Sequence, residues 1–291
     1  MSEAGHFEVL LVGPGLSGKH VIKIADELRR NSFTIHEQSW LYEPAAVRLR
    51  CAREEAVDDS LRKQLMDFAE ALELDAFVLD GERRRPKLFV FDMDSTLIQA
   101  EIIDELAGLA GVKDRVSAIT ERAMRGEINF RGALEERLRL LKGFPERRLQ
   151  ELLENVSLSE GVERLMRGLH DANVKTAIVS GGFGFFARHL KDRLGFDHLT
   201  RNELEIENGL LTGRPGAEMV DATRKAASLK EAANKERVAL EEVVAVGDGA
   251  NDLPMMQLAG IGVAYRAKPV VKASAQFRIT FSHLDSLLHL L

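Results

Sequence analysis

Two aspartates directly after an apolar run are residues of this sequence that could do chemistry. Leu88–Phe91 is uninterrupted by polar residues, and Asp92 and Asp94 follow it, separated by one residue. Two carboxylates this close repel each other unless a cation, a phosphate-handling role or a shared proton compensates. The spacing therefore predicts an acidic active site, although an ordinary acidic turn would use the same residue types.

Two further apolar runs end in residues of a similar kind. Val174–Val179 runs into Ser180-Gly181-Gly182, a hydroxyl and two amides that could cradle an oxyanion or simply form a flexible turn. Val243–Val246 runs into a loop that contains Asp248 and Asp252. If the three runs are neighbouring parallel strands, their ends form one pocket, because ligands of open α/β sheets bind beyond the carboxyl ends of the strands. Oxygen ligands without histidine or cysteine favour magnesium over zinc.

Hydrophobic spacing predicts the elements that must position these residues. The three runs lack polar alternation, as expected for parallel strands covered by helices on both faces. Met219–Lys235 has helical spacing and carries Lys225, which on its own would be an ordinary solvated lysine. Leu199–Ile206 and Leu210–Thr212 predict a small β excursion. Residues 99–158 are too long for a βα loop, and their helical spacing predicts a lid that excludes water and selects the substrate.

The first 84 residues form a separate pattern. The predicted strands are Phe7–Val12, Phe33–Leu41, Ala46–Cys51 and Ala76–Leu79, and the predicted helices are Leu16–Arg30 and Asp58–Leu74. This βαββαβ order is that of a ferredoxin-like unit, and Gly81–Pro86 is its exposed linker.

Gly13–His20 nearly matches a P-loop between the first strand and helix. A P-loop needs a Ser or Thr hydroxyl for its metal, and His20 stands at that position. We therefore expect only a turn and a helix start there.

The length, composition and charge of the chain limit the kinds of protein that it can be. A length of 291 residues suggests about two domains, and 45% hydrophobic residues suffice for real cores. A net charge of −6 gives no electrostatic footprint for nucleic acid. Cys51 is the single cysteine, which excludes an intrachain disulfide and fits a reducing compartment. With neither a signal peptide nor a long apolar segment, the sequence predicts a soluble cytoplasmic protein without membrane partners.

Together the motifs resemble those of the haloacid-dehalogenase-like phosphatases. The resemblance rests on Asp92-Met93-Asp94-Ser95-Thr96, Ser180-Gly181-Gly182, Lys225 and Gly247-Asp248-Gly249-Ala250-Asn251-Asp252, in that order. It extends from about Lys87 to the C-terminus, and the chain is similar in particular to the phosphoserine phosphatase family. The implied fold is an α/β, Rossmann-like parallel sheet core at 85–291 with a helical cap insertion at about 99–158. The ferredoxin-like unit at 1–84 resembles an ACT module only by its element order and the turn at Gly13-Pro14-Gly15.

The resemblance also implies roles for the motif residues. Asp92 would attack phosphorus to give an aspartyl phosphate, and Asp94 would act as general acid and then general base. Magnesium would be held by the side chains of Asp92 and Asp248 and the main-chain carbonyl of Asp94, with Asp252 as an outer ligand. The groups that would neutralise the transferring phosphoryl oxygens are Ser180, Lys225 and the amides of Met93, Asp94 and Gly181, and Asn251 is a further phosphate-binding position.

The lid would choose the substrate. In the resemblance, Glu101 binds the ammonium of O-phospho-L-serine and Arg137 its carboxylate, while Met124 and Phe130 pack over the substrate. The implied reaction is magnesium-dependent hydrolysis of phosphoserine, the last step of serine biosynthesis. A relative acting on another small phosphomonoester, or passing the phosphoryl group to an alcohol acceptor, would keep the same core motifs. A phosphate-receiving signalling domain would lack both the lid and the Asp-x-Asp pair.

The N-terminal unit also carries an expectation about assembly. A four-stranded sheet with two helices on one face leaves its other face and an edge strand available for pairing. We therefore expect a homodimer in which residues 1–84 are chiefly a dimerisation or regulatory module, with assembly favoured over ligand binding.

Overall fold

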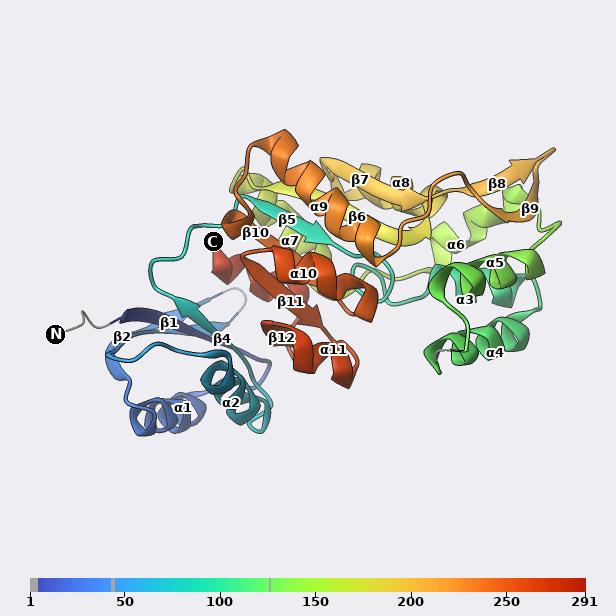
Figure 1. Cartoon of the computed structure of the whole chain (residues 1–291). Helices are drawn as coiled ribbons and strands as arrows, with labels where there is room; N and C mark the ends of the chain where they lie inside the picture. The colour runs from blue at the N-terminus through green and yellow to red at the C-terminus, as the bar shows by residue number, and fades with distance from the viewer. Residues whose placement is uncertain (1–4, 43–44, 126) are drawn as a thin grey trace.

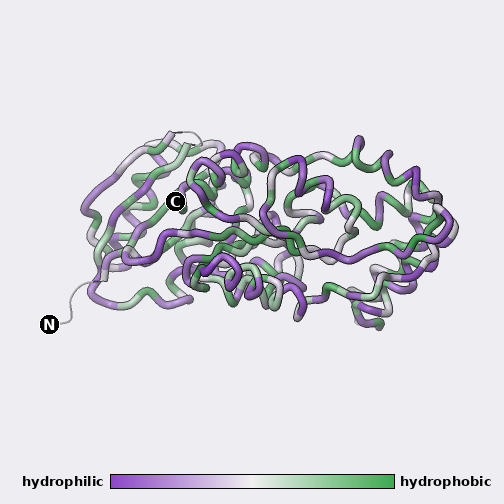
Figure 2. The backbone as a smooth tube through the Cα atoms, turned by 90° about the horizontal axis from the view of Figure 1, so that it is seen from above, coloured by the Kyte–Doolittle hydropathy of each residue, from purple (hydrophilic) through white to green (hydrophobic). Residues whose placement is uncertain are grey.

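The computed structural model describes residues 5–42, 45–125 and 127–291. It contains an antiparallel four-stranded sheet, a parallel six-stranded sheet and a two-stranded hairpin. Figure 1 shows the four-stranded sheet and its helices at one end of the molecule and the lid helices at the other. Figure 2, seen from above, shows the same elongated shape with the N-terminus at one end.

The N-terminal unit has the predicted βαββαβ order. Its elements are β1 (Gly5–Val12), α1 (Gly18–Arg30), β2 (Thr34–Leu41), β3 (Ala46–Arg53), α2 (Asp59–Glu70) and β4 (Asp75–Asp80). The strands lie in the order β2-β3-β1-β4. Helix α1 buries Val21, Ile24 and Leu28, at the helical spacing seen in the sequence, in a cluster with Val9 and Leu49 of the sheet. Both helices lie below the sheet in Figure 1.

The second face of this sheet was expected to be free, and at one end that expectation was wrong. Leu10 and Phe77 pack into the same buried cluster as Phe277, which lies in the parallel six-stranded sheet. Asp75 accepts hydrogen bonds from the backbone amides of Thr280 and Ser282 at 2.7 and 2.8 Å. Because the chain covers this end itself, what remains for a partner in the described part of this unit is the other end of the face and the edge strand β2.

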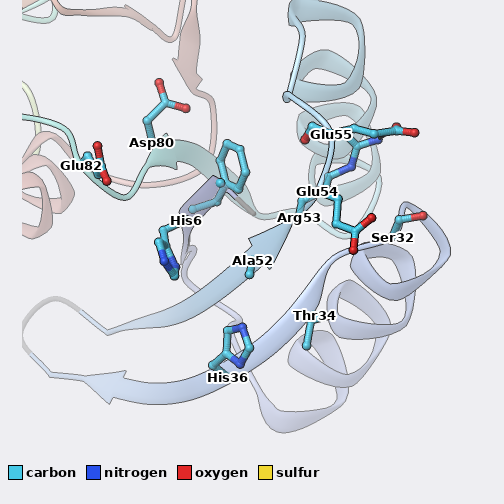
Figure 3. A pocket seen from close by; sticks show the side chains of 12 residues that line it. His6, Ser32, Thr34, His36, Ala52, Arg53, Glu54, Glu55, Asp80 and Glu82 are labelled. Carbon is cyan, nitrogen blue, oxygen red and sulfur yellow. Dashed lines mark hydrogen bonds and ion pairs between the residues drawn. The ribbon is translucent and has the colours of Figure 1, made fainter. Parts of the chain in front are cut away.

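The open end of that face is polar. His6, Ala52 and Thr34 are in register across β1, β3 and β2. They line a hollow of about 1130 Å³ together with His36 and Glu82. Figure 3 shows these side chains on the strands and at the loop ends. None of the predicted catalytic residues lines this hollow, so it is not the predicted active site.

The core of the second unit is the parallel sheet, in the order β12-β11-β10-β5-β6-β7. Its strands are β5 (Leu88–Phe91), β6 (Lys175–Phe183), β7 (His198–Asn202), β10 (Val243–Gly247), β11 (Ile261–Tyr265) and β12 (Phe277–Ile279). Strand β5 pairs in parallel with both β10 and β6. The three apolar runs of the sequence are therefore central neighbours, as the pocket prediction required.

Helices cover both faces of this sheet, which explains why β5 is apolar without alternation. Phe89 and Phe91 belong to one buried cluster, whereas Leu88 and Val90 belong to another on the opposite face. The helices and short turns are α7 (Val162–Asp171), α8 (Gly184–Leu194), α9 (Ala222–Glu236), η2 (Leu240–Glu242), η3 (Ala250–Asp252), α10 (Leu253–Leu258), α11 (Pro269–Ser274) and η4 (Leu284–Leu290). Among the described residues, no helix is long and apolar enough to cross a membrane.

The lid combines two separate segments of the chain. Its helices are α3 (Ile102–Leu109), α4 (Lys113–Met124), α5 (Phe130–Leu140), η1 (Glu146–Leu149) and α6 (Gln150–Asn155). At its base the amide of Gln99 donates to the carbonyl of Ser157 at 3.0 Å. The predicted β excursion is divided, since β7 joins the parallel sheet while β8 (Leu204–Glu207) pairs with β9 (Leu210–Pro215). Hydrogen bonds between Gly143–Phe144 and Leu211 then join this hairpin to the lid.

Candidate active site

Three aspartates meet at the carboxyl ends of β5 and β10. Oxygen atoms of Asp92, Asp248 and Asp252 all lie within 4.8 Å of one another, in the part of the chain that the structure describes. Asp92 follows β5 directly and Asp248 follows β10, so the parallel pairing of the two strands brings them together. Such a group of carboxylates is unfavourable without positive charge, and its oxygen donors suit a hard divalent cation.

Lys225 supplies one buried positive charge. Its ammonium lies 2.7 Å from Asp92 Oδ1 and 2.7 Å from Asp252 Oδ1, and its side chain is 0% exposed. Burial alone would lower the pKa of Lys225, but the two carboxylates outweigh this and raise it. The lysine that on its own would be an ordinary solvated residue is therefore charged and held between Asp92 and Asp252.

Burial raises the pKa of three aspartates, Asp92, Asp94 and Asp248, toward their protonated forms. It raises the pKa of Asp92 well above its ordinary value, with the charge of Asp252 as the next cause. Burial and then Asp252 raise the pKa of Asp248 to about 7. Burial and then Glu101 raise the pKa of Asp94 to about 8, so Asp94 can carry a proton at neutral pH, as a general acid must.

The side chain of Asp94 lies between the start of the lid and the glycine loop. Its Oδ1 accepts the amide of Ile102 at 3.1 Å, at the start of the lid. On the other side, a Cβ added to Gly182 would lie 2.4 Å from Asp94 Oδ2. The absence of a side chain at Gly182 is therefore what lets the glycine loop approach Asp94.

Ser180-Gly181-Gly182 forms a loop beside these carboxylates. Ser180 is fully buried, and its Oγ accepts the amide of Gly182 at 2.8 Å. The strand before it pairs with β5, which carries Asp92 at its end. The hydroxyl, the glycine amides and the carboxylates thus come from neighbouring strands, as the sequence predicted.

Two charged lid residues lie close to the pocket. Glu101 accepts a hydrogen bond from Ser95 Oγ at 2.8 Å. Burial lowers the pKa of Arg137, and the negative charges of Asp104, Glu101 and Asp94 act in the opposite direction. An anion and a cation of the lid are therefore near Asp94.

Four other residues named from the sequence are Phe130, Asn251, Asp252 and Met124. A Cβ on Gly181 would lie 3.6 Å from Phe130 Cζ, so this aromatic ring reaches the glycine loop. Asn251 is half-buried in η3, next to Asp252. Asp252 uses both oxygens within the protein, on Lys225 and on the amide of Gly249 at 3.0 Å. The side chain of Met124 lies outside the described residues.

Sequence reasoning missed two residues that hold the site. Thr96 Oγ1 donates to Asp248 Oδ1 at 3.4 Å, and the sequence marked it only as part of a motif. Asn202 contacts both the glycine loop and the segment before α9. Nothing in the spacing around Asn202 separates it from an ordinary polar residue at a strand end.

Comparison with known proteins agrees with this geometry. The haloacid dehalogenase-like hydrolase family matches residues 89–257, from β5 to α10. A phosphoserine phosphatase of Archaeoglobus fulgidus is 52% identical over 229 residues, 78% of this chain and 67% of that protein. One of Haemophilus influenzae is 46% identical over 226 residues, 77% of this chain and 72% of that protein. This chain belongs to the phosphoserine phosphatase family of haloacid dehalogenase-like hydrolases.

A solved member of the family covers nearly the whole chain. The unliganded structure of a probable phosphoserine phosphatase from Vibrio cholerae has a TM-score of 0.78 at 37% identity, over 99% of this chain and 86% of that one. A substrate-bound phosphoserine phosphatase complex has a TM-score of 0.67 at 37% identity, over 71% of this chain and 98% of that one. The second structure matches a smaller share of this chain because that protein is shorter. The ACT-like character of residues 1–84 stays a prediction.

Proposed function

We propose that this protein hydrolyses O-phospho-L-serine to L-serine and phosphate. The observation that carries the proposal is that Asp92, Ser180 and Asp248 lie at or near the carboxyl ends of neighbouring strands, where Lys225 of α9 pairs with Asp92. Two charged lid residues, Glu101 and Arg137, lie near Asp94. The family relationship supports the same reaction. Its product would be the serine released in the last step of serine biosynthesis.

In the first half-reaction, a carboxylate oxygen of Asp92 attacks phosphorus and the bond from phosphorus to the serine oxygen breaks. Asp94 gives its proton to that leaving oxygen, which its raised pKa of about 8 allows at neutral pH. Ser180 Oγ and the amide of Gly181 donate hydrogen bonds to the phosphoryl oxygens. The enzyme then carries a phosphorylated Asp92 and a deprotonated Asp94.

In the second half-reaction, Asp94 takes a proton from a water molecule that attacks phosphorus. The bond from phosphorus to Asp92 breaks, and phosphate leaves with Asp92 restored as a carboxylate. Each proton that Asp94 loses in the first step is thus regained in the second. Lys225 stabilises the carboxylate form of Asp92 at the start and end of the cycle.

We propose magnesium as the cofactor, held by the side chains of Asp92 and Asp248 and by the carbonyl of Asp94. The donors are all oxygens, and Lys225 alone leaves the clustered carboxylates with excess negative charge. When bound, the ion neutralises phosphoryl oxygens. Turnover should be lost in EDTA and restored by magnesium, with calcium a poor substitute because it takes more ligands at longer distances. Equal turnover with either ion would contradict this coordination.

The lid is proposed to recognise the amino acid part of the substrate. Glu101 would bind the ammonium and Arg137 the carboxylate, since a guanidinium can hold a carboxylate through two hydrogen bonds. Phe130 lies over the glycine loop and would exclude water from the bound substrate.

A substrate panel tests the proposed function. We expect phosphate release from L-phosphoserine to exceed that from phosphoethanolamine, which lacks the carboxylate, and from glycerol phosphate, which lacks both charged groups. Faster release from another ester, or transfer of the phosphoryl group to an alcohol in place of water, would favour a related phosphatase or phosphotransferase. A single turnover without further release would indicate a signalling domain.

We also propose a homodimer through the edge strand β2. Among the described residues this strand pairs with β3 alone, and Trp40 within it and Tyr42 just after it are 37% and 80% exposed. Light scattering should give twice the chain mass, and Trp40→Lys should shift it toward the monomer, because edge lysines oppose strand pairing. A monomeric wild type would refute the proposal.

A further inference from the structure

The glycine loop interrupts the pairing of β6 with β7. The ladder pairs Val179 with Thr200 and resumes with Phe183 and Asn202. Ser180, Gly181 and Gly182 therefore stand opposite the single residue Arg201. Such a bulge leaves backbone groups without ladder partners, and buried groups of this kind need other hydrogen bonds.

The side chain of Asn202 supplies one of these hydrogen bonds. Its Nδ2 donates to the carbonyl of Gly181 at 2.7 Å, and its Oδ1 accepts the backbone amide of Val220 at 2.6 Å. Asn202 is 2% exposed. Only one orientation of the amide gives both bonds, because a carbonyl must accept and an N–H must donate. The side chain therefore links two backbone segments at a fixed separation.

The second of these segments leads directly to Lys225. Val220 precedes Asp221, whose side chain caps α9 by accepting the amide of Arg224 at 2.8 Å. The amide of Lys225 donates to the carbonyl of Asp221 at 2.8 Å, in the first turn of the helix. The position of Val220 thus sets where α9 begins and from where Lys225 reaches Asp92.

We propose that Asn202 is a positioning residue for phosphoryl transfer. It fixes the Ser180–Gly182 loop relative to the start of α9, so that the loop and the Lys225–Asp92 pair meet at one phosphoryl group. Gly181 and Val220 are close enough that a Cβ on Gly181 would lie 3.2 Å from the Val220 carbonyl oxygen, so a small shift of either segment changes the pocket. The inference rests on the proposed function for the roles of these groups.

Two substitutions test it in the full-length protein. Asn202→Ala removes both hydrogen bonds, whereas Asn202→Asp keeps the volume and an acceptor for Val220 but places a carboxylate oxygen against the Gly181 carbonyl. The matched control is Thr176→Val, at the start of β6 and far along that strand from the glycine loop. Thr176 is also fully buried, and its Oγ1 bonds to Asp197 at 3.2 Å, away from the site.

The expected result is a separation of kcat from KM. Both Asn202 variants should lose about 10- to 100-fold in kcat, because catalysis is sensitive to displacements of about 1 Å. Their KM for phosphoserine should stay within about threefold, since Glu101 and Arg137 are untouched. Thr176→Val should lower the melting temperature as Asn202→Ala does, but leave kcat within about twofold.

Three outcomes would overturn the proposal. The first is an Asn202→Ala variant that folds and keeps wild-type kcat, and the second is an equal loss of kcat in Thr176→Val. The third is a failure of both Asn202 variants to fold, which would assign Asn202 to the stability of the fold rather than to the site. If the wild type hydrolyses another phosphomonoester and not phosphoserine, the proposed substrate fails, and the same comparison of kcat is made with that ester.

Discussion

Lys225→Met should destabilise the metal-free protein far more than Lys175→Met. Both lysines lie 2.7 Å from a carboxylate oxygen, so the two ion pairs have the same geometry. The side chain of Lys175 is 45% exposed, whereas that of Lys225 is 0% exposed and serves both Asp92 and Asp252. The two lysines therefore differ in burial and in the number of carboxylate partners, and not in the distance to a partner.

The expected magnitudes follow from that difference. Removing one partner of a buried pair leaves an uncompensated charge and costs about 3 to 5 kcal/mol, while an exposed pair contributes about 0.2 to 1 kcal/mol. Urea unfolding in EDTA at neutral pH gives both values. Magnesium should recover part of the loss in Lys225→Met and none in Lys175→Met, because only the first leaves carboxylates beside the proposed metal site. Equal destabilisation of the two variants would refute the assignment of Lys225 as a buried, charged residue.

Four further outcomes are expected. Asp92→Asn should abolish turnover and phosphoenzyme formation while the fold is retained, and an active variant would rule out Asp92 as the nucleophile. Arg137→Ala should raise KM for phosphoserine much more than for phosphoethanolamine, and parallel losses on both would instead mean general support of the lid. In EDTA the free energy of unfolding should fall as the pH rises from about 4 to about 8, and magnesium should flatten this dependence, as urea titrations can show. The stability falls with pH because the pKa is raised to about 8 for Asp94 and to about 7 for Asp248. The folded state therefore keeps protons that the unfolded state releases, and this stabilisation is lost as the pH rises through the folded-state pKa values. Deleting residues 1–84 should leave phosphatase activity in place but lower the melting temperature. The deletion uncovers Phe277 and removes Asp67 and Glu70, the partners of the buried Arg278. An unchanged melting temperature would show that these contacts do not stabilise the protein.

Residues 1–84 make contacts with the rest of the chain that indicate a structural role for this unit. Arg278 is 6% exposed, and its guanidinium pairs with Asp67 and Glu70 of α2. Asp75 holds the backbone that follows β12. These contacts bury charged groups of the core against the N-terminal unit. A supporting role within each chain therefore stands beside the proposed role in assembly.

The sequence by itself determined the parallel sheet and the residues at its strand ends. Apolar runs without polar alternation before Asp92, Ser180 and Asp248 indicated strands buried on both faces, because only such strands need no polar side. The βαββαβ order of the first unit followed from alternating and helical spacing, which depend on local geometry alone. The motif residues supplied the chemistry through their types and their order.

Only the tertiary structure decided which segments meet. Hydrophobic spacing shows that a face is buried but not what covers it, so it did not show that Phe77 packs with Phe277 or that the hairpin of Leu211 joins the lid. A lysine in an amphipathic helix has the same local pattern whether solvated or buried, and only the packing of α9 places Lys225 between Asp92 and Asp252. Asn202 carries no local signal at all, because its two partners lie 21 and 18 residues away in the chain.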